Sequence, residues 1–292
     1  MSKKTKGIIL IICSAFFFAL MNMFVRLSGD LPSIQKSFFR NFVALFFALA
    51  VLLKNRTDLS PVKGNVKFLL IRSVFGTIGI LANFYAIDHM ILTDASMLNK
   101  LSPFFAVIFS AIFLKERVRP WQMLAVIGAF IGSLFIIKPS LEIEQVFPYI
   151  IGFIGGMGAG AAYTAVRHLG SRGVPGGVIV FVFSAFSCLF CLPFALASYV
   201  PMSLAQIVLL LFAGLSATGG QFCITYAYTY APAREISVYD YTQIIFSAVL
   251  GYFVLSQTPD LYSFLGYVII CSMGILNFLF NKKHSNQTVT QK

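Results

Sequence analysis

The chain has 292 residues, of which 58% are hydrophobic and 11% are charged, and its mean hydropathy is +0.85. About a quarter of the residues in a soluble domain are charged, so this composition excludes a soluble globular protein. The formal net charge of +12 alone would suit a nucleic-acid-binding protein, and its distribution along the chain decides that question below.

Apolar stretches of about 20 residues recur along the whole chain, and this is the length at which a helix crosses the hydrocarbon core of a bilayer. Turn-forming and charged residues lie in the breaks between these stretches. We therefore predict an all-α, polytopic membrane helix bundle. Its transmembrane helices, about ten in number, are expected over 7–27, 34–53, 68–88, 92–114, 120–138, 148–167, 174–198, 203–228, 232–256 and 260–280.

The first stretch is interpreted as an uncleaved span, because it is longer than a signal-peptide core and lacks a small-residue cleavage site. The cysteines also lie inside predicted spans, where structural side chains are expected rather than disulfides. No histidine has metal-ligand spacing and no catalytic constellation is found, so neither a metal nor another cofactor is expected. The cysteines are Cys13, Cys188, Cys191, Cys223 and Cys271.

Lysine and arginine are distributed unequally between the two sides of the predicted bundle. Most lie in the termini and in the loops on the same side as the N-terminus, whereas the opposite side and its flanks hold only Arg26, Lys36 and Lys138. The positive-inside rule then places both termini in the cytoplasm of a multi-pass inner-membrane protein. Because topology accounts for the excess charge, no nucleic-acid partner is expected.

The second half of the chain repeats features of the first at a constant offset of 141 residues. Matching positions are Val25-Arg26 with Val166-Arg167, Gly79 with Gly220, Tyr85-Ala86 with Tyr226-Ala227, Asp94 with Glu235, and Ser96 with Ser237. The repeats are expected over 7–138 and 148–280, followed by a cytoplasmic tail over 281–292. Each repeat contains five of the ten predicted helices. Because five is an odd number, the second repeat enters the membrane from the opposite face. Such inverted repeats are typical of alternating-access transporters.

Two segments carry a family resemblance: Phe84-Tyr85-Ala86, and the run from Leu101-Ser102-Pro103 to Phe113-Leu114-Lys115-Glu116. With the five-plus-five duplication, they resemble the EamA-like family of the drug/metabolite transporter superfamily over residues 7–280. The resemblance implies secondary transport through a cavity lined by spans one, three, four, six, eight and nine. The second repeat departs from the pattern, since Ile244 matches Pro103 and Gln257 matches Glu116.

Charged residues deep in apolar spans are the main site candidates, because each costs roughly 2.5–3.5 kcal/mol at a helix centre. At the 141-residue offset, Asn99 matches Asp240 and Lys100 matches Tyr241. Polar stripes at helical spacing surround them: Ser96, Asn99, Lys100 and Pro103 in span four, and Ser237, Asp240, Gln243 and Ser247 in span nine. We predict that the stripes face each other across the substrate path, with Lys100 and Asp240 as coupling residues. The alternative is an ion pair that only fixes helix packing.

Other polar residues inside the spans are weaker candidates for substrate binding. Tyr85, Tyr163, Tyr239 and Tyr241 could stack on a solute or donate a hydrogen bond to it, while other tyrosines suit an interfacial belt. Asn22 and Gln221 could bridge helices or contact the solute. The substrate-binding candidates are thus Lys100, Asn99, Asp240, Tyr241, Tyr239, Tyr85, Asn22, Tyr163, Gln221 and Gln243.

Three further patterns have structural interpretations. Arg40 and Arg72 lie near the ends of their spans, so their side chains are expected to snorkel to the headgroups. Asp94 and Glu235, which match in the repeat, suit symmetrical gates or caps. Glycines at four-residue spacing favour close helix packing: Gly152, Gly156 and Gly160 in span six, and Gly128 and Gly132 in span five.

The sequence favours a secondary transporter for a small metabolite, driven by a proton or sodium ion and surrounded by membrane lipids, as a monomer or homodimer. The family resemblance implies export of an amino acid or a related organic solute. An importer of a nucleotide-like or quaternary-amine solute is an alternative within the same superfamily. An intramembrane enzyme acting on lipids is an alternative from another class, but it would need paired acids or metal ligands that the sequence lacks.

Overall fold

The computed structural model describes residues 3–57, 60–113, 118–137, 143–230 and 237–290, and this part of the chain is almost entirely helical. Nine of its helical stretches are long and apolar enough to cross a membrane. The remaining predicted span is the ninth, 232–256, and its start lies outside the described residues. The long helices are α1 (Lys3–Leu27), α2 (Ser33–Asn55), α3 (Val66–His89), α6 (Pro120–Ile137), α7 (Ile143–Ser171), α8 (Gly176–Ala197), α9 (Leu204–Tyr230) and α12 (Leu261–Thr290).

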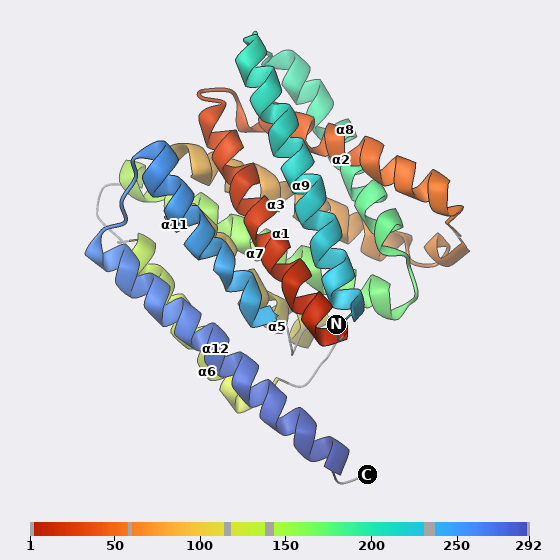
Figure 1. Cartoon of the computed structure of the whole chain (residues 1–292), viewed down its shortest axis with the longest axis vertical. Helices are drawn as coiled ribbons and strands as arrows, with labels where there is room; N and C mark the ends of the chain where they lie inside the picture. Colours follow the sequence, from red (N-terminus) through yellow and green to blue (C-terminus); the bar gives the residue numbers. More distant parts are fainter. Residues whose placement is uncertain (1–2, 58–59, 114–117, 138–142, 231–236, 291–292) are drawn as a thin grey trace.

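The helices pack in a pattern that is unchanged when the two halves of the chain are exchanged. The first helix of one repeat packs along the third helix of the other, so that α1 lies against α9 and α7 lies against α3. Equivalent helices also pair with each other, α2 with α8 and α6 with α12; Figure 1 shows α9 along α1, and α12 over α6. Repeats related by a two-fold axis produce this pattern. The predicted bundle of two inverted five-helix repeats is confirmed.

Spans four and nine are each interrupted at the same position of their repeat. Span four consists of α4 (Leu92–Asn99) and α5 (Ser102–Phe113), and span nine continues from a 3₁₀ turn, η2 (Ser237–Tyr241), into α11 (Thr242–Leu255). Lys100 stands in the first break and the matching Tyr241 ends the 3₁₀ turn. Pro103 accounts for the first break, since its ring cannot donate the backbone hydrogen bond to Asn99. Broken helices of this kind form the central sites of many transporters.

Glycines of α7 allow the first helix break to approach α7 closely, as their spacing predicted. A Cβ atom on Gly160 would lie 2.5 Å from Cβ of Phe105 and 2.8 Å from the carbonyl oxygen of Ser102. A Cβ atom on Gly132 of α6 would likewise lie 2.9 Å from Ile269 and Ile270 of α12. Gly160 therefore lets the broken span, and the site on it, lie close to α7, and Gly132 does the same for α6 and α12.

We expect Gly160→Ala to destabilise the protein by about 1–3 kcal/mol, because the added methyl group overlaps backbone and cannot be accommodated by a rotamer change. Gly170 is the matched control in the same helix, since nothing lies within 4 Å of a Cβ atom there. Gly170→Ala should stabilise the protein by about 0.5–1 kcal/mol through the loss of glycine's backbone freedom. Thermal unfolding in detergent checks both, and equal midpoints for Gly160→Ala and the wild type would contradict the packing argument.

Candidate functional site

The two helix breaks bring opposite charges together at the interface of the repeats. Nζ of Lys100 lies 2.6 Å from Oδ2 of Asp240, and their side chains are only 7% and 16% exposed. The other carboxylate oxygen, Oδ1 of Asp240, is buried and has no hydrogen-bond partner. The structure thus brings Lys100 and Asp240 into contact, and it leaves one carboxylate oxygen available for another ligand.

A chain of neutral polar side chains crosses the repeat interface one helical turn before Lys100. Oγ of Ser96 lies 2.8 Å from Oγ of Ser247, which joins α4 of the first repeat to α11 of the second. Asn22 of α1 donates a long hydrogen bond of 3.4 Å to Oγ of Ser96, and Asn83 of α3 donates one of 3.5 Å to Asn22. The polar stripes predicted on spans four and nine therefore face each other; the side chain of Ser237 lies outside the described ones.

A cavity of about 90 Å³ lies beside these residues, between the two repeats. Six predicted site residues line it: Asn22, Asn99, Lys100, Tyr163, Gln221 and Gln243. Pockets that enclose a small-molecule ligand usually measure about 300–1,000 Å³, so helices must move apart to admit a metabolite. Tyr163 of α7 lines the cavity from the second repeat, while Arg40 and Arg72 line it from the first.

Three predicted tyrosines lie away from the cavity lining in this structure. Tyr85 stacks on His89, with ring centroids 4.0 Å apart. It follows the cavity-lining Asn83 by two residues, which turns it about 200° around α3. Tyr239 packs in a small apolar cluster with Ile11, and the ring of Tyr241 lies against Gly274 of α12.

The snorkelling interpretation of Arg40 and Arg72 is wrong. Each residue is only 5% exposed, and both line the cavity together with Phe183. The guanidinium carbon of Arg72 lies 4.0 Å from the centroid of the Phe183 ring, and that of Arg40 lies 5.7 Å from it. The helix rise gives the depth of a residue but not the face it occupies, and both arginines lie on the buried face of their helices.

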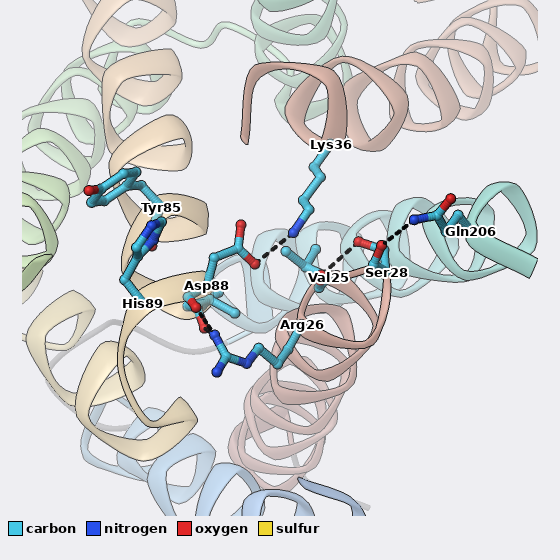
Figure 2. A network of polar contacts seen from close by, with 9 residues as sticks. Val25, Arg26, Ser28, Lys36, Tyr85, Asp88, His89 and Gln206 are labelled. Atoms are coloured by element: carbon cyan, nitrogen blue, oxygen red, sulfur yellow. Dashed lines mark hydrogen bonds and ion pairs between the residues drawn. The ribbon is translucent and has the colours of Figure 1, made fainter. Parts of the chain in front are cut away.

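A second charged cluster closes the end of the bundle where α1 and α3 finish and α2 begins (Figure 2). Nζ of Lys36 lies 2.6 Å from Oδ1 of Asp88, and Lys36 is completely buried. Arg26 donates hydrogen bonds to the carbonyl oxygens of Ile87, at 2.8 Å, and of Asp88. These residues, Arg26, Lys36 and Asp88, are called the end cluster below. They tie the three helices α1, α2 and α3 together.

Contacts between the repeats reinforce the same end of the bundle. Gln206 of α9 donates a 3.0 Å hydrogen bond to the carbonyl oxygen of Ser28, as Figure 2 shows. Gln35 of α2 pairs with Val200 through both its side-chain oxygen and its nitrogen, at 3.1 and 3.0 Å. Oδ1 of Asp94 accepts a 2.5 Å hydrogen bond from Tyr267 of α12.

The ion pair of the end cluster is not repeated at the matching positions of the second repeat. At the 141-residue offset, Lys36 matches Gly177 and Asp88 matches Thr229, so the equivalent ion pair cannot form there. Asp94, predicted as one of two symmetrical gates, is bound to α12, and its match Glu235 lies outside the described residues. The Lys36–Asp88 ion pair is therefore not duplicated by the repeat.

Comparison with known proteins identifies the family. The model of the EamA-like transporter family matches residues 5–138 and again 146–279. The pseudopaline exporter CntI of Pseudomonas aeruginosa is 34% identical over 269 residues, which cover 90% of this chain and 93% of that protein. Human solute carrier family 35 member G1 is 24% identical, over 92% of this chain and 78% of that protein.

A crystal structure with 15% sequence identity matches the fold, with a TM-score of 0.66 over 96% of this chain and 98% of its own. The repeated match to the family and the 34% identity to a transporter agree with the bundle and its central cavity. The chain is therefore a multi-pass membrane transporter of small solutes and not an enzyme, and it belongs to the EamA-like transporter family.

Proposed function

We propose that the protein is a secondary transporter that exports a small polar metabolite from the cytoplasm by alternating access. The observation that carries the proposal is the buried Lys100–Asp240 pair at the meeting point of two broken helices, beside a cavity between inverted repeats. Rocking of the repeats about this pair would open the cavity to each side of the membrane in turn.

The direction of transport is inferred from the likeness to an exporter, and the sidedness of the end cluster agrees with loading from the cytoplasm. The positive-inside rule puts the end cluster on the outer side of the membrane, with both termini in the cytoplasm. The ion pair of Lys36 and Asp88 then closes the outer side in the state described, and solute loads from the cytoplasm. The likeness to an exporter in Pseudomonas aeruginosa supports the same direction.

Coupling is assigned to Asp240 and Lys100. A solute carboxylate that binds Lys100 would compete with Asp240 for the ammonium group. Released from Lys100, and with Oδ1 already unpartnered, Asp240 would take up a proton or a sodium ion. Exchange of partners at one ion pair thus links solute binding to ion binding, in a protein embedded in lipid as a monomer or homodimer.

A comparison of secreted metabolites tests this function. Cells producing the wild type should accumulate in their medium a metabolite that is absent when they produce Asp240→Asn. Asp30→Asn is the matched control, because Asp30 is an exposed carboxylate between α1 and α2. Mass spectrometry of the medium, followed by uptake of that metabolite into inside-out vesicles, gives the measurement. Identical media for wild type and Asp240→Asn, at equal protein levels, would refute the proposal.

A further inference from the structure

We infer that Arg40, Arg72 and Phe183 form a binding subsite for a carboxylate group, on the side of the cavity formed by α2, α3 and α8. The inference rests on the proposed function, because the carboxylate would belong to the transported solute. It adds a second contact point, separate from Lys100 and Asp240, and it restricts the solute to acids.

Burial without a counter-charge is the first observation. Arg40 and Arg72 are each 5% exposed, and Nε of both has no hydrogen-bond partner. Arg40 donates one hydrogen bond, from Nη1 to Oδ1 of Asn41 at 2.6 Å. Within the part of the chain that the structure describes, neither guanidinium pairs with a carboxylate. Two like charges buried without an anion are costly for folding, so an anionic ligand is the natural partner of the pair.

The second observation is that Gly76 leaves room for the guanidinium group of Arg72. Gly76 stands one helical turn after Arg72, and any Cβ atom there would overlap Nη1 of Arg72 and come within 2.9 Å of the Phe183 ring. Phe183 in turn offers its face to Arg72 at 4.0 Å, a cation–π geometry that holds the guanidinium without neutralising it. The planar donor group is therefore fixed in place with its charge unmatched.

The charge balance of the cavity sets the class of ligand. Lys100 is already paired with Asp240, so the cavity keeps an excess of two positive charges, both on the two arginines. A guanidinium group matches a carboxylate through two parallel hydrogen bonds, which a lysine cannot offer. Tyr163 and Gln243, which line the same cavity, could donate hydrogen bonds to the rest of such a solute.

Binding of succinate to the purified full-length protein in detergent tests the subsite, with succinamide as its uncharged counterpart and sodium chloride to equalise ionic strength. Succinate should raise the unfolding temperature of the wild type, and succinamide should not. This increase in unfolding temperature should vanish in Arg40→Gln and Arg72→Gln. It should be reduced in Arg72→Lys, which keeps the charge but loses the two parallel hydrogen-bond donors of the guanidinium. Arg119→Gln is the matched control, since Arg119 is exposed beside Trp121 and outside the cavity. It should respond to succinate like the wild type.

The unfolding temperature without ligand separates a binding role from a structural one. If the arginines are kept for a ligand, Arg40→Gln and Arg72→Gln should unfold at or above the wild-type temperature, because each removes an unmatched buried charge. Variants that fail to fold, or unfold well below the wild type, would overturn the inference, as would a wild type indifferent to succinate or a succinate effect retained in both variants. Because this assay needs no flux, its result stands apart from that of the export assay.

Discussion

Lys100→Met and Asp240→Leu, each alone, should destabilise the protein by about 3–5 kcal/mol, and the double substitution should recover most of that loss. Each single change leaves a charge buried without its partner, and in measured buried pairs this costs several kcal/mol. The double change replaces both charges by apolar side chains of similar volume, which is often neutral for stability. Both groups are well shielded from solvent, at 7% and 16% exposure, so these energies apply.

Transport separates the two interpretations of this ion pair. If the pair serves only to fix helix packing, the double variant Lys100→Met/Asp240→Leu should fold and also transport at the wild-type rate. If Asp240 couples ion binding to solute binding, the double variant should fold and yet transport nothing. Thermal unfolding and vesicle uptake on the same preparations provide the comparison. A double variant with wild-type transport would leave the coupling assignment without support.

The Lys100–Asp240 contact was accessible to sequence analysis for a physical reason. An isolated charge in an apolar helix is too costly to face lipid, so two opposite charges at matching depth must find each other or water. The offset of 141 residues gave that matching depth, and glycines at four-residue spacing marked the close helix contacts. The tyrosines were less predictable, because one residue of helical phase decides whether a ring faces the cavity or a neighbouring helix, as Tyr85 shows.

The arginines of the proposed carboxylate subsite were misjudged although the sequence contains a signal. Lys36, Arg40, Ala44 and Ala48 recur every four residues and are all buried, so they mark the inward face of α2. Small and polar residues on one face, opposite exposed phenylalanines, outweigh the argument from depth alone. Phe183 carries no such signal, because it is one of 32 phenylalanines and only the three-dimensional packing sets it beside Arg72.

With the sidedness proposed above, Asp88→Asn should open the outer side of the transporter. It leaves Lys36, which is completely buried, without its carboxylate partner, at a cost of about 3–5 kcal/mol in the closed state. Water reaches Lys36 once this end opens, so the open state escapes most of the cost. A free-energy difference of this size changes the ratio of open to closed molecules from about 1:99 to predominantly open. Arg26 still binds the carbonyl oxygens at the end of α3, so the helices that separate should be α2 and α3.

A cysteine placed in the cavity reports this opening. Ala162→Cys, in a variant with the five native cysteines replaced, adds a thiol to a buried residue of the cavity lining. In right-side-out vesicles a membrane-impermeant maleimide should label it quickly in Asp88→Asn and slowly in the parent. Asp30→Asn, at an exposed carboxylate of the same end, should label like the parent.

The repeat offset also predicts how labelling from the two sides of the membrane should compare. Gly177 and Thr229 stand at the positions that match Lys36 and Asp88, so the repeat does not duplicate this ion pair at the inner end. The parent should therefore label faster in inside-out vesicles than in right-side-out ones, and Asp88→Asn should reverse that order. Equal labelling from both sides in the parent would show that the end cluster does not set the resting state. Faster labelling of the parent from outside would contradict the assigned sidedness, in which the end cluster closes the outer side.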